Sequence, residues 1–109
     1  NVAARTEDLI LQHNPGWPRA GWRGVHPEQV QALDEAGFQV VESFSYTLDV
    51  PFTHKAWRGR IRTCNGVGST LMHAQVAAFD AELEMLLEKE FAGELLVPHR
   101  IFATTGVAP

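Results

Sequence analysis

The chain of 109 residues contains a single cysteine, Cys64. An intrachain disulfide needs two cysteines, so none can form, and a reducing, cytoplasmic setting is the default expectation. The sequence also lacks a run of about 18 or more apolar residues, which a membrane-spanning helix would need. We therefore expect no membrane association.

Positive charge is scarce as well, with 9 Lys and Arg against 13 Asp and Glu, for a formal net charge of -4. Nucleic-acid-binding domains usually carry a basic excess over the whole domain, so this balance argues against general nucleic-acid binding. The length fits one domain or part of one. A chain of this size buries only about two-thirds of its unfolded surface, so modest stability is expected.

Metal-binding spacings are missing too. The five histidines and Cys64 show no Cys-x-x-Cys, His-x-x-x-His or Glu-x-x-His pattern, which are the spacings of common zinc sites. We predict no metal site from these residues, which are His13, His26, His54, His73, His99 and Cys64.

Apolar periodicity and end signals predict about four helices and two strands. The expected helices are residues 2–13, a helix opened by His26-Pro27-Glu28 and closed by Gly37, a helix capped by Thr53, and a long helix over 71–91. The expected strands are 38–50 and 95–105. Residues 15–25 read as a loop, whose Trp17 and Trp22 should pack against something.

The strand over 38–50 alternates apolar and polar residues, which predicts one half-buried face and one solvated face. Two strands alone form a sheet that is marginal in water. One edge should therefore be paired elsewhere. If the chain is a fragment of a larger sheet, it should form a homodimer through this exposed sheet edge, by sheet extension or strand exchange.

The most informative stretch is residues 52–62, which read FTHKAWRGRIR and place a tryptophan among four cations. In a helix, Trp57 and Ile61 share an apolar face, and Arg58 and Arg62 stack at i, i+4 on a neighbouring face. Two interpretations are open. Trp57 and the arginines could line a substrate pocket, or Trp57 could be core while the arginines bridge to the acidic face over 80–90.

The order of the segments DVPFTH, AWRGRIR, NGVGSTL and VPHRIFA, with a long acidic helix before the last, resembles the C-terminal part of bacterial class I methyltransferases. The resemblance runs from about TEDLILQHNP to the end of the chain. At the start of the long helix that family tends to have a Ser-Pro-like cap, whereas this chain has Met72-His73. We expect Ser69 or Thr70 to serve as the cap instead.

The resemblance implies an α+β segment: a two-stranded antiparallel ribbon with about four helices, from the C-terminal end of an α/β methyltransferase sheet. The parent would transfer a methyl group from S-adenosylmethionine to a small-molecule acceptor. This fragment of 109 residues would lack the cofactor-binding half, bind no cofactor itself and not turn over alone. It would supply substrate-side residues, for which we nominate Trp57, Arg58, Arg62 and His54; no catalytic residue can be assigned.

Two other functions fit the same residues. The chain could be an interaction module whose sheet edge and tryptophan loop serve oligomerisation, or an anion-binding domain that uses the arginine cluster. The glycines at 66 and 68 could suggest a phosphate loop, but GVGST lacks the P-loop lysine and does not follow a strand. A turn between two helices is the better interpretation.

Overall fold

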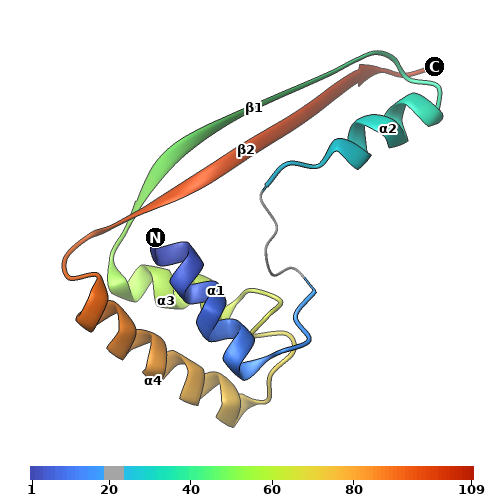
Figure 1. Ribbon diagram of the computed structural model, residues 1–109. Coiled ribbons are helices and arrows are strands. Elements are labelled where there is room, and N and C mark those ends of the chain that lie inside the picture. Colours follow the sequence, from blue (N-terminus) through green and yellow to red (C-terminus); the bar gives the residue numbers. More distant parts are fainter. Residues whose placement is uncertain (19–23) are drawn as a thin grey trace. The chain divides into compact units, whose positions relative to one another are not determined.

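The computed structural model describes residues 1–18 and 24–109 (Figure 1). Trp22, whose packing was predicted above, lies outside the described residues. The elements, in chain order, are α1 (Val2–His13), α2 (Pro27–Glu35), β1 (Gln39–Phe52), α3 (His54–Arg62), α4 (His73–Glu90) and β2 (Leu95–Val107).

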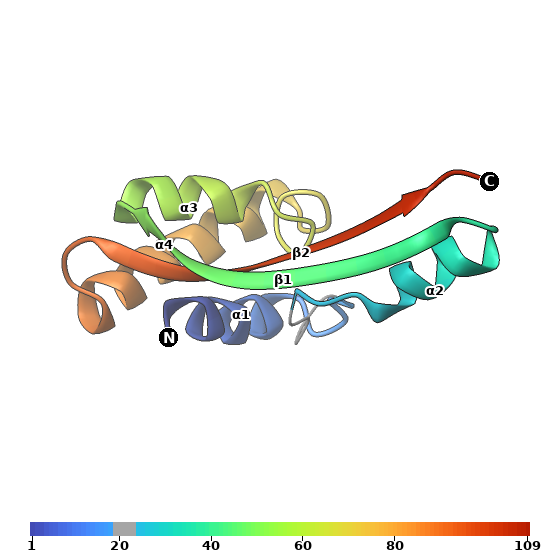
Figure 2. The same cartoon turned by 90° about the horizontal axis from the view of Figure 1, so that it is seen from above.

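The predicted α+β class is confirmed over the described residues, which form four helices and one two-stranded antiparallel sheet. β1 and β2 run side by side in opposite directions in both views (Figures 1 and 2). In the part of the chain that the structure describes, no helix is long and apolar enough to cross a membrane.

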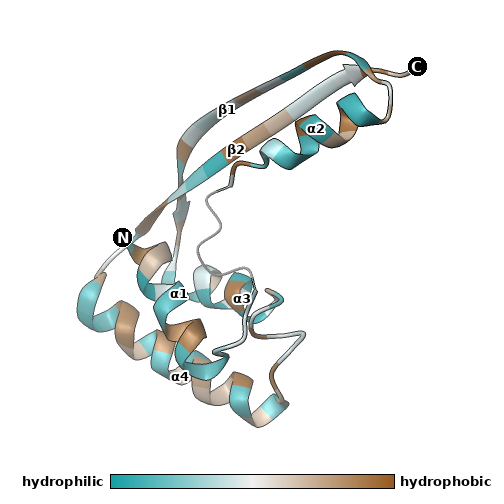
Figure 3. Ribbon diagram, turned by 45° about the vertical axis from the view of Figure 1, so that its right-hand side comes forward, coloured by the Kyte–Doolittle hydropathy of each residue, from teal (hydrophilic) through white to brown (hydrophobic). Residues whose placement is uncertain are grey.

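The chain divides into two compact units, residues 1–21 with 49–97 and residues 22–48 with 98–109. In the first unit, α1 and α3 both pack against α4 (Figure 1). Hydrophobic and hydrophilic residues alternate along α4 (Figure 3), as expected of a helix with one buried stripe. Among the described residues, the buried hydrophobic side chains all lie in this unit: Val2, Leu9, Ile10, Trp57, Ile61, Val67, Phe79, Leu83, Leu87, Leu95 and Val97.

Side-chain caps fix where the helices of this unit begin. Asn1 Oδ1 accepts from the backbone N–H of Ala4 at 2.9 Å, and Thr53 Oγ1 accepts from that of Ala56 at 3.0 Å, as predicted for Thr53. The expected cap of α4 is wrong. Its N-cap is Met72, which has no side-chain cap hydrogen bond, and the backbone N–H of Met72 donates to Gln75 Oε1 at 2.8 Å.

The second unit has no buried side chain among its described residues. Three alternate residues of β1 are exposed, Phe44 by 57 %, Tyr46 by 49 % and Leu48 by 41 %. The predicted half-buried face of this strand is therefore uncovered, because no described element buries it. The rings of Phe44 and Tyr46 stack in parallel, with centroids 6.4 Å apart.

Candidate functional site

α3 and α4 meet through four charged side chains, Arg58, Arg62, Asp80 and Glu84, which we call the Asp80 network. Arg58 grips the Asp80 carboxylate with two parallel bonds, Nε to Oδ1 at 3.1 Å and Nη2 to Oδ2 at 2.6 Å. Arg62 Nη1 donates to Oδ1 of the same carboxylate at 2.8 Å. Glu84 Oε2 lies 3.3 Å from Arg58 Nη2. The two arginines therefore do grip one carboxylate from two sides, and that carboxylate belongs to the chain itself.

Pairing shifts the pKa values of Asp80 and Arg58 in opposite directions. Hydrogen bonds from Arg58, supported by those from Arg62, lower the pKa of Asp80 below its ordinary value of 3.8, against the opposing effect of burial. The hydrogen bond to Asp80 likewise raises the pKa of Arg58. The side chains of Asp80 and Arg58 are 17 % and 22 % exposed, so the pair is partly shielded from water and salt.

Trp57 points into the core of the first unit rather than toward a surface, and it is 5 % exposed. Its indole Nε1 donates to Thr6 Oγ1 at 3.1 Å, and the Thr6 hydroxyl donates in turn to the Val2 carbonyl at 2.8 Å. Phe52 packs against the Trp57 ring in a T-shaped arrangement, with centroids 5.2 Å apart. These contacts hold the Trp57 ring in the core of the first unit.

His54, at the first position of α3, is bound to the end of α4. Its Nε2 lies 2.7 Å from the carbonyl oxygen of Phe91. A carbonyl oxygen only accepts, so Nε2 is the donor in this hydrogen bond. His54 also lines a pocket of 330 Å³ together with Thr53, Gly93 and Glu94.

The four nominated residues thus sit together on α3 but face different partners. Trp57 is core, and Arg58 and Arg62 bridge to the acidic face of α4, as the second of the two interpretations predicts. Their role in binding substrate stays a prediction. Lys55 and Arg60, the other cations of the segment, are exposed on α3.

Thr6 lies among the buried residues of α1, three and four positions before Leu9 and Ile10, and the local sequence does not identify its partner. The signal was present, because a polar residue on a buried stripe needs a hydrogen bond. Asp80 was one acid among several on the long helix, and nothing in its local sequence distinguishes it from Glu82 or Glu84. Its partner on α3 lies 22 residues away in the chain.

The glycine-containing turn joins α3 to α4, as predicted. A Cβ added at Gly68 would collide with the carbonyl oxygen of Arg62, and one added at Gly66 would lie 2.9 Å from Trp17 Cε2. These glycines are required because other parts of the chain pass close to them. The backbone N–H groups of Val67 and Gly68 donate to the carbonyl oxygen of Cys64 at 3.2 and 2.9 Å, so these two donors are used within the chain.

We expect Gly68→Ala to lower the free energy of unfolding by about 1–3 kcal/mol, because the carbonyl of Arg62 is backbone and cannot swing away. Urea unfolding followed by circular dichroism measures the change. Gly16→Ala is the matched control, since nothing lies within 4 Å of a Cβ built at Gly16. Equal effects of the two substitutions would contradict the close approach at Gly68.

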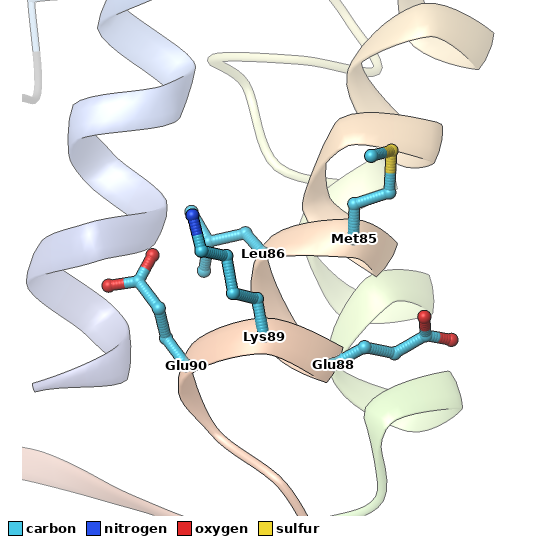
Figure 4. Close-up of a pocket in the computed structure, with 5 residues that line it drawn as sticks. All are labelled: Met85, Leu86, Glu88, Lys89 and Glu90. Carbon is cyan, nitrogen blue, oxygen red and sulfur yellow. The ribbon is translucent and has the colours of Figure 1, made fainter.

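The last turns of α4 line an open pocket of 490 Å³. In Figure 4, Lys89 and Glu90 reach toward α1, whereas Met85 and Glu88 point away from it. Glu90 is already engaged, because Arg5 on α1 donates to its two carboxylate oxygens at 3.1 and 3.0 Å. These hydrogen bonds lower the pKa of Glu90. The lining of the pocket therefore includes Glu90, which is bound to α1, and the exposed side chain of Met85.

Over residues 1–18 and 24–109, no group of three or more His, Cys, Asp or Glu side chains could hold a metal ion. A scan against protein-family models and searches of curated proteins and of solved structures returned no match.

Proposed function

We propose that this chain is the C-terminal, substrate-side segment of an S-adenosylmethionine-dependent methyltransferase that acts on a small-molecule acceptor. The proposal starts from the resemblance carried by DVPFTH, AWRGRIR, NGVGSTL and VPHRIFA. The observation that carries it furthest is the bare apolar face of β1, with Phe44, Tyr46 and Leu48 exposed. Exposing three large apolar side chains on one face of a strand is energetically unfavourable. In a larger sheet with helices on its faces, a helix would cover these side chains.

The arrangement of β1 and β2 also supports the proposal. In the methyltransferase fold the last strand runs antiparallel to the strand before it and lies between that strand and the fifth. Here β2 pairs antiparallel with β1, and its other side has no strand beside it among the described residues. The proposed parent would fill that side with its fifth strand.

In this proposal the upstream part of the parent binds the cofactor, and this segment contacts the methyl acceptor. The family's cofactor motifs lie upstream and none is present in this sequence, so the upstream part would bind S-adenosylmethionine. Methyl transfer depends mainly on aligning donor and acceptor and on excluding water. His54, which lines a small pocket, is the residue of this chain that we propose to contact an acceptor group. A cytoplasmic location belongs to the same proposal.

The test is to sequence the reading frame upstream of the codon for Asn1 and to titrate its whole product with S-adenosylmethionine by calorimetry. We expect a strand, a glycine-rich turn and an acid at the end of the next strand, and saturable binding by the whole product. The 109-residue chain alone should give no binding heat. A start codon within a few residues of Asn1, or a whole product that does not bind, would contradict the proposal.

The second candidate is an interaction module, and the same uncovered face of β1 favours it. A small chain whose ribbon exposes apolar side chains can gain its missing burial from a partner instead of from an upstream domain. The sequencing experiment separates the two, because an early start codon would make the chain autonomous.

A further inference from the structure

The free edge of β1 is the feature of the molecule that points to a partner. In the two-stranded sheet β1 has a neighbour on one side only, over the residues that the structure describes. The other side presents a row of backbone N–H and C=O groups, which is a template for another strand. Four large apolar side chains of this strand are exposed, those of Val40, Phe44, Tyr46 and Leu48. On β2 only Leu96 and Val107 are exposed among the described large apolar residues, and residues 101–104 between them are half-buried.

The residues of β1 are arranged so that the strand complements itself. Phe44, Tyr46 and Leu48 lie two residues apart, so they share one face and are symmetric about Tyr46. If two copies pair antiparallel about a two-fold axis at Tyr46, Phe44 of each copy falls opposite Leu48 of the other. Tyr46 then falls opposite its own counterpart, and Ser45 opposite Thr47 on the other face.

Charges along the strand agree with this register. The two acids of β1, Glu42 and Asp49, would fall opposite Val50 and Ser43, so no acid faces another. Moving the axis by one residue to Ser45 places Leu48 opposite Glu42. Moving it to Thr47 places Phe44 opposite Val50 and Glu42 opposite Phe52. The axis at Tyr46 is therefore the register in which the three exposed apolar residues meet one another.

We propose that β1 is a homodimerisation strand, which pairs through its free edge with β1 of a second copy about a two-fold axis at Tyr46. Isologous pairing of this kind closes on itself and leaves no new edge at the junction. The contact uses the backbone and the flanks of the three side chains, so their outer face stays available to a covering layer. The proposal thus holds whether or not the chain belongs to a methyltransferase.

Opposite charges at residue 46 test both the surface and the register. Analytical ultracentrifugation of the 109-residue chain should show a concentration-dependent dimer. In Tyr46→Lys and in Tyr46→Glu, like charges face each other across the axis, and the dissociation constant should rise by about tenfold or more. An equal mixture of the two variants places lysine opposite glutamate, and it should restore the dimer as a heterodimer.

Tyr46 is 49 % exposed, so both variants should keep the helical circular dichroism of the parent chain. The matched control is Met85→Lys, which adds the same charge at a 69 % exposed apolar residue on α4 and should leave the dimer unchanged. Four results would each overturn the proposal. These are a monomeric parent chain at all accessible concentrations, dimers that persist in the single variants, a mixture that stays monomeric, and an equal loss of dimer in Met85→Lys.

Discussion

Trp57→Ala is expected to lower the free energy of unfolding by about 3–5 kcal/mol, the usual cost of truncating a large buried aromatic side chain. Trp57 is 5 % exposed, and it joins three segments of the first unit: Phe52 at the end of β1, Thr6 on α1, and α3 itself. The alanine would leave a cavity among all three. Small domains are stable by only about 5–15 kcal/mol, so a large share of the stability would be lost.

A second variant of Trp57 separates the contribution of the aromatic ring from that of the hydrogen bond, and a variant of Trp17 serves as a control. Trp57→Phe keeps an aromatic ring in the core but loses the hydrogen bond to Thr6, so it should cost about 1–2 kcal/mol. Trp17→Ala is the matched control, because Trp17 is half-buried and its Nε1 is bonded to Asn65 at 3.1 Å. Urea unfolding measures all three. If Trp57→Ala were as stable as the parent chain, Trp57 would be a surface residue and its role as a substrate wall would gain support.

The start and the buried face of α3, the helix that carries Trp57, could both be predicted from the local sequence. Thr53 predicted its cap, and the spacing of Trp57 and Ile61 predicted the face that is buried. Both signals lie within a few residues of each other, so no knowledge of the rest of the fold was needed. The turn at Gly66 and Gly68 was predicted for the same reason.

The partners of these residues could not be derived from the sequence. Trp57 bonds to Thr6, which is 51 residues away, and Arg58 to Asp80, which is 22 residues away. Local sequence left the arginines open to a carboxylate of the chain or to a ligand, because both satisfy a guanidinium equally well. The alternation in β1 correctly predicted a strand with one apolar face. Whether that face is covered depends on what packs on it, which periodicity does not encode.

Asp80→Asn is expected to lower the free energy of unfolding by about 1–3 kcal/mol near neutral pH. Asn keeps one acceptor oxygen but removes the charge on which Arg58 and Arg62 converge. Hydrogen bonds to charged groups contribute about 1.5–3 kcal/mol each, and the partial exposure of Arg62 reduces the total. The matched control is Glu88→Gln, which removes a charge from an exposed residue of the same helix and should change stability by less than about 0.5 kcal/mol.

The effect should depend on pH in a definite direction. The pKa of Asp80 is lower in the folded chain than its ordinary value of 3.8, so unfolding near that value takes up a proton. The stability that Asp80 contributes is therefore full above its ordinary pKa, and it is lost as the pH falls through the lowered value. Asn does not titrate, so the stability difference between the parent chain and Asp80→Asn should stay constant near neutral pH and shrink as the pH falls below the ordinary value of 3.8.

Comparing the two proteins at each pH isolates Asp80 from the other carboxylates. Glu90 also has a lowered pKa because of Arg5, but it is present in both proteins and its contribution cancels. A stability difference that stays constant as the pH falls would show that Asp80 acts through packing and not through charge.

Asp80→Asn also tests whether Arg58 and Arg62 can bind an anion once the Asp80 carboxylate is removed. Titrating both proteins with phosphate should show binding only in the variant, because in the parent chain the guanidinium groups are already held by Asp80.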